Sequence, residues 1–221
     1  MKPTKEYNGR SRIRMYNCDC MELMKTGSWD LAVVDPPYGI GASNDQRFGT
    51  KTKKAGSKRN DYTKKKWDLY IPHSKYFKLI KSVSKNQIIW GANYFNLKGG
   101  RLFWHKNQTS YTSSNGELAY LSMKNGIDYI DLLWHGAYQF DMKNKEHRIH
   151  PTQKPVKLYK YLLTNYAKEG DTILDTHGGS LSIAIACWDL GFDLDVCELD
   201  SDYFNDAVKR FEQHVAQGQL F

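Results

Sequence analysis

The sequence contains no long hydrophobic run and has only four cysteines and six prolines. No apolar run approaches the ~20 residues that a membrane-spanning helix needs. The N-terminal residues lack the apolar stretch of a secretory signal. Cys18, Cys20, Cys187 and Cys197 form no C-x-x-C pair, and the histidines show no ligand spacing. We therefore expect a cytoplasmic protein with reduced thiols and without a metal site.

Acidic side chains are scarce in one stretch of the chain. Residues 47–66 hold nine basic residues and one acid, Asp61, and account for the whole net charge of +8. A basic segment without apolar periodicity is typical of a mobile surface loop, here over residues 42–70. A solvated loop is the alternative, but the position directly after a strand-end motif favours contacts with the phosphates of DNA. The predicted contact residues are Arg47, Lys51, Lys53, Lys54, Lys58, Arg59, Lys64, Lys65 and Lys66.

The most informative motif is Asp35-Pro36-Pro37-Tyr38, which ends the apolar run 31–34. A short β-branched run that stops at two prolines predicts a buried parallel strand, because proline lacks a ladder N–H. Open α/β sheets bind ligands at the carboxyl ends of their strands. A carboxylate, a stiffened carbonyl and an aromatic ring suit an exocyclic amine, because the oxygens accept its hydrogens and the ring stacks on its base. A plain proline turn after a core strand is the alternative.

Hydrophobic periodicity predicts about seven strands alternating with helices. The 221 residues, 40% of them hydrophobic, suffice for one α/β domain over 1–221. The predicted strands cover 12–16, 31–34, 87–90, 101–104, 117–123, 172–174 and 192–197. The predicted helices cover 74–83, 156–167, 182–190 and 201–215, the last with Ser201 as its cap. This alternation is typical of a doubly wound, mainly parallel, Rossmann-like sheet.

A second candidate site lies near the end of the sequence. The turn Asp175-Thr176-His177-Gly178-Gly179-Ser180 follows one predicted strand, and Glu198 follows the next. Glycines let the backbone approach a ligand closely, and an acid after the second strand is placed to bind a ribose diol. The G-x-G-x-x-G fingerprint is absent, which favours a nucleoside without a pyrophosphate over NAD. For the glycine turn alone, an ordinary strand-to-helix connection is the alternative.

These two motifs, with His150-Pro151-Thr152-Gln153-Lys154-Pro155, resemble the amino-methyltransferases of DNA. Those enzymes transfer a methyl group from S-adenosylmethionine to N6 of adenine or N4 of cytosine. The order resembles the β group, in which the Asp-Pro-Pro-Tyr motif comes first and the cofactor motif last. Asn86 to Phe95 and Glu117 to Tyr120 resemble further family segments. The resemblance implies a seven-stranded methyltransferase sheet, circularly permuted to start at the family's third strand. The compact size resembles phage or prophage members.

The resemblance also implies roles for individual residues. Asp35, Pro36, Pro37 and Tyr38 would be catalytic, acting on a base flipped out of the duplex. Asp19, in Asn17-Cys18-Asp19, resembles the acid that contacts the cofactor's adenine. The implied cofactor-binding residues are Asp19, Cys20, Thr152, Gln153, Lys154, Asp175, Thr176, His177, Gly178, Gly179, Ser180, Glu198 and Leu199.

The cofactor turn departs from the family's usual Asp-Pro-Phe-x-Gly-Ser-Gly at three positions. Thr176, His177 and Leu181 stand where the family has Pro, Phe and Gly. His177 would either stack on the adenine as Phe does or be a substituted core residue. Leu181 would either crowd the cofactor's methionine end or simply begin the helix. These departures leave the cofactor affinity open.

N6-adenine methylation of double-stranded DNA is the preferred activity, because cytosine enzymes of the family more often carry Ser in place of Asp35. The alternatives are N4-cytosine methylation, methylation of RNA or a protein amide, and a DNA-binding protein that has lost cofactor binding. Carbon-5 cytosine methylation is disfavoured because no Pro-Cys pair is present. Restriction protection, regulation and anti-restriction all stay open as biological roles.

Three segments are left to recognise the target sequence: the basic loop 42–70, residues 106–116 and residues 124–148. The last combines aromatic and basic side chains, which suits groove and phosphate contacts. An edge hairpin of the core is the alternative for it. Such a small recognition region predicts a short target site or help from a second subunit in a homodimer.

Overall fold

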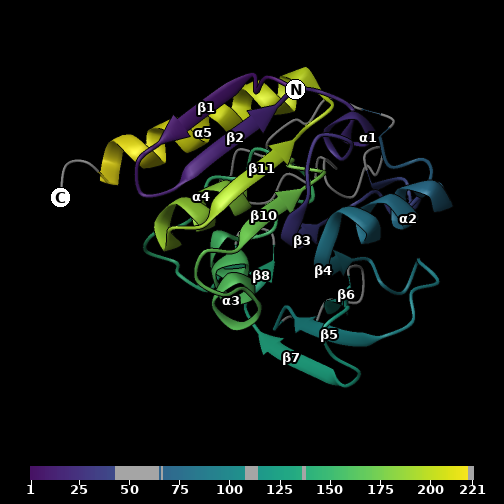
Figure 1. Cartoon of the computed structure of the whole chain (residues 1–221). Coiled ribbons are helices and arrows are strands. Elements are labelled where there is room, and N and C mark those ends of the chain that lie inside the picture. The colour runs from purple at the N-terminus through teal and green to yellow at the C-terminus, as the bar shows by residue number, and fades with distance from the viewer. Residues whose placement is uncertain (43–64, 66, 108–113, 136–137, 219–221) are drawn as a thin grey trace.

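The computed structural model describes residues 1–42, 65, 67–107, 114–135 and 138–218 (Figure 1). Its main element is one large sheet, which confirms the α/β class. The strands of this sheet are β1 (Lys5–Asn8), β2 (Arg12–Tyr16), β3 (Trp29–Val34), β4 (Ser84–Trp90), β5 (Gly100–His105), β6 (Gly116–Leu121), β7 (Ile127–Asp131), β10 (Thr172–Asp175) and β11 (Asp193–Cys197). Strands β8 (Trp134–His135) and β9 (Tyr138–Gln139) pair separately.

The strand order is β1-β2-β11-β10-β3-β4-β6-β5-β7. Strands β2, β11, β10, β3 and β4 are mutually parallel, and β6 runs antiparallel to both β4 and β5. In Figure 1 the last two strands of the chain, the green β10 and the yellow-green β11, therefore lie between β2 and β3 from the purple N-terminal part. This is a mostly parallel methyltransferase-like sheet, and its interpretation as a circular permutation stays a prediction.

The predicted count of seven strands is wrong, because the described sheet has nine. All seven predicted strands are present, and the two additional ones lie at the edges. β1 is largely exposed, and β7 alternates between exposed and half-buried positions. Edge strands carry little apolar periodicity, so hydrophobic patterning gives them no clear signal.

Alternation along the central strand divides the core into two layers. Leu31 and Val33 point to a cluster that includes residues of α3 (Val156–Tyr166), α4 (Ser182–Leu190) and α5 (Ser201–Gly218). Ala32 and Val34 point to a second cluster with residues of α1 (Cys20–Leu23) and α2 (Ser74–Val83). Successive side chains of a strand face opposite sides, so β3 is buried on both faces. None of the described helices is long and apolar enough to cross a membrane.

The parallel register brings the two sequence motifs together. β10 lies directly between β3 and β11, with Leu174 opposite Ala32 on one side and Asp175 opposite Val196 on the other. The segments that leave the carboxyl ends of these three strands are the Asp35–Tyr38 loop, the turn 175–180 and Glu198. These three segments lie at the same edge of the sheet, the edge at which an open α/β sheet binds its ligand.

Candidate active site

The Asp35–Tyr38 loop folds back on itself at the end of β3. The Tyr38 hydroxyl donates to Asp35 Oδ1 at 2.5 Å, and Lys154 Nζ donates to Asp35 Oδ2 at 2.5 Å. The Lys154 side chain is only 3% exposed. Asp35 is therefore held between a hydroxyl and an ammonium group, both of which stabilise its charged form.

The ring of Tyr38 is fixed by aromatic neighbours that follow β4. It stacks on Tyr94 with centroids 5.0 Å apart and meets the edge of Phe95. Gly91 has a φ of +76°, and a Cβ built there would lie 2.3 Å from Tyr38 Cε1. Only glycine allows the Tyr38 ring to lie this close to the end of β4.

A carboxylate that sequence analysis missed holds the backbone of the Asp35–Tyr38 loop. Asp68 Oδ1 accepts the N–H groups of Tyr38 and Gly39 at 2.7 and 2.9 Å, and Oδ2 accepts that of Ala42 at 2.8 Å. Asp68 is 1% exposed. It lies within the predicted basic loop 42–70, between Trp67 and Leu69, where an aspartate outside any motif gives no sequence signal for this role.

The cofactor turn is buried and carries perturbed ionisable groups. Asp175 Oδ1 accepts the N–H of His177 at 3.0 Å, and burial raises the pKa of Asp175 to about 8. Burial lowers the pKa of His177 to about 4, so its ring is neutral at pH 7. Thr176 Oγ1 lies 2.7 Å from the Tyr76 hydroxyl and 2.9 Å from His177 Nδ1. The turn is thus linked to α2 through Tyr76.

Glu198 lies beside the turn 175–180, directly after β11. Its Oε2 accepts the N–H of Gly179 at 2.8 Å, and its Oε1 accepts that of Asp200 at 2.9 Å. Burial raises the pKa of Glu198 above its ordinary value. Each carboxylate oxygen has two lone pairs, so the carboxylate can accept more hydrogen bonds than these two.

Two further predicted cofactor residues, Asp19 and Leu199, are exposed. Asp19 is exposed and accepts the N–H of Met21 at 2.8 Å, which caps α1 at Cys20. Leu199 is 71% exposed beside Glu198. The His150 ring lies close to the glycine turn, because a Cβ built on Gly179 would be 3.8 Å from it.

The motif 150–155 contributes hydrogen bonds that support the backbone and the Asp35 side chain. Thr152 Oγ1 lies 3.2 Å from His150 Nδ1, and burial lowers the pKa of His150 to about 3. The Gln153 amide accepts the N–H of Ile149 and donates to the carbonyl of His147. The structure therefore places Gln153 in backbone support and Lys154 beside Asp35, while their predicted cofactor contacts stay predictions.

One part of the chain matches a known protein family. Residues 123–209, which include the turn 175–180 and Glu198, match the N6/N4-methyltransferase family of DNA methylases. This part of the chain is therefore similar to the DNA amino-methyltransferases. No curated protein sequence matches it significantly.

Solved structures show that the amino-methyltransferase fold extends over most of the chain. The complex of M1.HpyAVI with SAM has a TM-score of 0.58 at 17% identity and covers 90% of this chain and 99% of its own. The cytosine-N4-specific PvuII DNA methyltransferase has a TM-score of 0.56 at 11% identity, covering 92% and 90%. TTHA0409 from Thermus thermophilus, a putative DNA modification methylase, has a TM-score of 0.51 at 15% identity, covering 91% and 95%. At these identities the likeness concerns the fold.

One departure from the usual sequence of the DNA amino-methyltransferases has a backbone consequence. Leu181, in the position of the family's glycine, has a φ of +54° and is 1% exposed. A left-handed conformation costs a non-glycine residue about 1–2 kcal/mol. The buried side chain offsets this cost, since removing a buried leucine typically destabilises by about 2–5 kcal/mol.

We expect Leu181→Ala and Leu181→Gly both to destabilise the protein, with the glycine variant the more stable of the two by about 1 kcal/mol. Glycine accepts the left-handed conformation without strain, whereas alanine loses the packing and keeps the strain. Urea unfolding of both variants measures the difference. The usual helix ranking, with alanine more stable than glycine, would contradict the left-handed conformation at this position.

Most of the predicted DNA-contact residues lie outside the described residues, namely Arg47, Lys51, Lys53, Lys54, Lys58, Arg59, Lys64 and Lys66. Lys65 is described. Its Nζ pairs with Asp200 at 2.5 Å and Asp202 at 2.8 Å and lies 4.8 Å from the Tyr203 ring centre. Asp200 also accepts the N–H groups of Asp202 and Tyr203, so it caps α5 and the predicted Ser201 cap is wrong. Contact of Lys65 with DNA stays a prediction.

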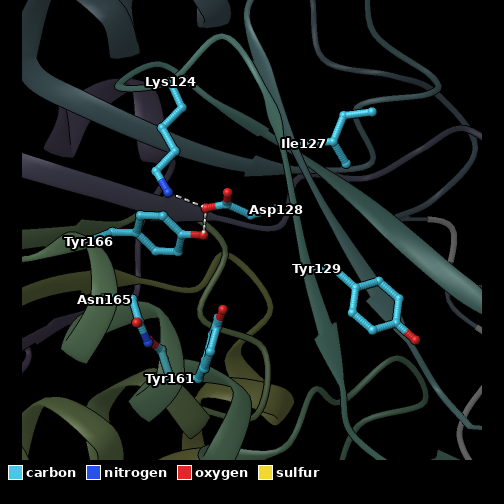
Figure 2. Close-up of a pocket in the computed structure, with 7 residues that line it drawn as sticks. All are labelled: Lys124, Ile127, Asp128, Tyr129, Tyr161, Asn165 and Tyr166. Atoms are coloured by element: carbon cyan, nitrogen blue, oxygen red, sulfur yellow. Dashed lines mark hydrogen bonds and ion pairs between the residues drawn. The ribbon is translucent and has the colours of Figure 1, made fainter.

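The predicted recognition segment 124–148 contains β7, which pairs parallel to β5 at the edge of the sheet, and the β8–β9 hairpin. A cavity of about 390 Å³ lies between β7 and the end of α3. Figure 2 shows Lys124 and Tyr166 both bonded to Asp128 there, while Tyr129 points away from them. No residue that lines this cavity belongs to the Asp35 loop or the cofactor turn, so it is separate from the candidate active site. Among the described residues, no cluster of His, Cys, Asp and Glu is suited to a metal ion.

Proposed function

We propose that this amino-methyltransferase transfers a methyl group from S-adenosylmethionine to N6 of adenine in double-stranded DNA. The observation that carries the proposal is the convergence of the Asp35–Tyr38 loop, the turn 175–180 and Glu198 at the ends of three adjacent strands. This arrangement provides acceptors for an amino group and for a nucleoside next to each other. The presence of Asp at position 35, where cytosine enzymes more often carry Ser, favours adenine.

The residues of the cofactor edge fit S-adenosylmethionine. The Glu198 carboxylate follows directly on β11 and can accept hydrogen bonds beyond those from Gly179 and Asp200, which suits the ribose hydroxyls. Gly179 has a φ of +50°, which shapes the turn that presents its N–H to Glu198. The neutral, half-buried ring of His177 can pack on an adenine as the family's Phe does. We infer that Asp19, Gly178, Gly179 and Glu198 hold the nucleoside part.

The chemistry proceeds by direct transfer. The cofactor, when bound, supplies an electrophilic methyl group. A lone pair of the adenine amino nitrogen forms the new N–C bond while the electrons of the C–S bond return to sulfur. Asp35 and the Pro36 carbonyl accept the amino hydrogens, which directs the lone pair at the methyl group. Positive charge develops on nitrogen, and the ionised Asp35 stabilises it before the proton leaves to water. Because an exocyclic amine is a poor nucleophile, orientation carries much of the acceleration.

The target base must leave the duplex to reach this loop, at a cost of a few kcal/mol. Tyr38 provides a ring for stacking, although in this structure one neighbour, Tyr94, already stacks on it. We infer that the basic residues of 47–66 contact phosphates while segment 124–148 approaches the target sequence.

N4-cytosine methylation is the second candidate. The similar fold of the cytosine-N4-specific PvuII enzyme supports it, at a TM-score of 0.56. The Asp35 loop would accept a cytosine amino group by the same geometry, because both substrates present an exocyclic –NH2.

Mass spectrometry of nucleosides tests the proposal directly. DNA from methylation-free cells that express this chain is digested and compared with DNA from cells expressing Asp35→Ala. We expect N6-methyladenine with the wild-type chain and none with the variant. Detection of N4-methylcytosine would mean that the target base is cytosine, while the mechanism of direct transfer would stand. A soluble, expressed wild-type protein that leaves no modified base would contradict the proposed function.

A further inference from the structure

Four side chains of alternating charge form a continuous chain that ends at the catalytic carboxylate. Lys106 donates to Glu117 Oε1, and Lys154 Nζ lies 3.0 Å from Glu117 Oε2 and 2.5 Å from Asp35 Oδ2. Glu117 belongs to β6, and Lys106 follows β5. All four side chains are at most 22% exposed. These contacts join the antiparallel part of the sheet to the active site.

The Lys154 ammonium is held by two hydrogen bonds and an ion pair. Its Nζ donates to Asp35 Oδ2 and, at 3.3 Å, to the Tyr38 hydroxyl. It also forms an ion pair with Glu117 Oε2 at 3.0 Å. The rings of Trp90 and Tyr38 surround the same ammonium, with centroids at 5.1 and 5.8 Å. The ammonium therefore has a single favourable position, which in turn fixes the plane of the Asp35 carboxylate.

Burial and charge act against each other on Asp35. Burial raises the pKa of Asp35, whereas the positive charge of Lys154 lowers it and the negative charge of Glu117 raises it. Lys106 and Lys154 outweigh burial at Glu117 and lower its pKa to about 2, so Glu117 is a carboxylate at neutral pH.

The groups that face Asp35 come from every element packed against it. Tyr38 lies on its own loop, Glu117 on β6, Lys154 before α3, Tyr159 on α3 and Asp175 on β10. Lys154 is the one cation among these groups. The carboxylates of Glu117 and Asp175 oppose an additional negative charge, whereas the Tyr38 hydroxyl favours it by donating to Asp35. Lys154 is therefore the one positively charged group here that favours the ionised form of Asp35.

We propose that Lys154 and Glu117 are an opposed pair of positioning residues that sets the charge and orientation of Asp35 for methyl transfer. Lys154 keeps Asp35 ionised, and Glu117 shares the same ammonium so that it does not hold Asp35 too tightly to accept the target amino group. An unshared buried ion pair would saturate the carboxylate and compete with the substrate. The inference rests on the proposed methyl transfer for its kinetic test.

The two residues predict opposite changes in the pH dependence of catalysis. Lys154→Met removes the cation and raises the pH at which Asp35 ionises, so the acid limb of the single-turnover rate moves to higher pH. Glu117→Gln removes a like charge and moves the limb to lower pH. The ratio of the rates of Glu117→Gln and Lys154→Met should therefore rise at least about tenfold between pH 9 and pH 5. Lys154→Arg should restore the wild-type limb in part, because the charge is kept.

Lys85→Gln is the matched control, because Lys85 also pairs with an aspartate, Asp30, but is 78% exposed at the other end of β3. Its limb should coincide with that of the wild type. Limbs of Lys154→Met and Glu117→Gln that stay in place, or move in the same direction, would overturn the proposal.

A second measurement tests the proposal without relying on activity or on the folding of Lys154→Met. The carboxyl carbon of Asp35 is titrated by NMR in ¹³C-aspartate-labelled protein and assigned by its loss in Asp35→Asn. A lower titration midpoint in Glu117→Gln than in the wild type supports the proposal, and an unchanged midpoint refutes it. If the wild-type chain methylates no DNA while the midpoint shifts, the proposed function fails and the inference about Asp35 stands.

Discussion

Asp35→Asn is expected to lower the rate of the methyl-transfer step by at least about 100-fold while leaving cofactor affinity unchanged. The variant keeps the shape of the side chain and one carbonyl oxygen, so the target amino group still has an acceptor. It loses the negative charge that opposes the positive charge developing on nitrogen. Such a charge acts strongly because Lys154 beside it is nearly inaccessible to water, at 3% exposure.

Single-turnover transfer of a labelled methyl group to DNA measures this effect, and calorimetry with S-adenosylmethionine measures binding. Asp30→Asn is the matched control, because Asp30 lies on the same strand but accepts from Lys85 and Thr172 away from the Asp35 loop. It should lower stability without slowing transfer. A rate for Asp35→Asn within fivefold of the wild type would mean that Asp35 acts as a neutral acceptor or not at all.

The parts of the site that the sequence predicts are those in which motif and strand are contiguous. The run 31–34 is apolar because β3 is buried on both faces, and two prolines end it directly before Tyr38. Likewise Glu198 follows a buried strand, and the glycine turn follows another. In each case local patterning locates a strand end, and parallel pairing then brings the ends together.

The parts that the sequence did not predict depend on contacts between distant residues. Lys154 belongs to the motif 150–155, but nothing in that motif shows that its partner is Asp35, which lies 119 residues earlier. Glu117 lies in an amphipathic strand where a glutamate is equally compatible with a solvated face. The left-handed conformation of Leu181 is similarly hidden, because leucine rarely adopts it.

Asp68 is the remaining residue that only the fold identifies, and its replacement should have the second-largest effect. Asp68→Ala removes the acceptor of three backbone N–H groups, those of Tyr38, Gly39 and Ala42. Hydrogen bonds to a charged group contribute about 1.5–3 kcal/mol each. Because the three donors belong to one loop after β3, we expect the loop to lose its fixed conformation while the sheet stays folded. A displacement of about 1 Å at reacting groups costs about 100-fold in rate, so methyl transfer should fall by that order.

Asp68→Asn separates the two oxygens. Its carbonyl oxygen can still accept from Tyr38 and Gly39, as Oδ1 does now, but its amide group cannot accept from Ala42. The transfer rate of Asp68→Asn should therefore lie between those of the wild type and Asp68→Ala. Asp171→Ala is the control, since Asp171 accepts the N–H of Lys168 in a turn before β10 and has no part in the loop. Equal rates for Asp68→Ala and Asp171→Ala, with both proteins folded, would mean that the two prolines alone hold Tyr38 and Asp35 in register.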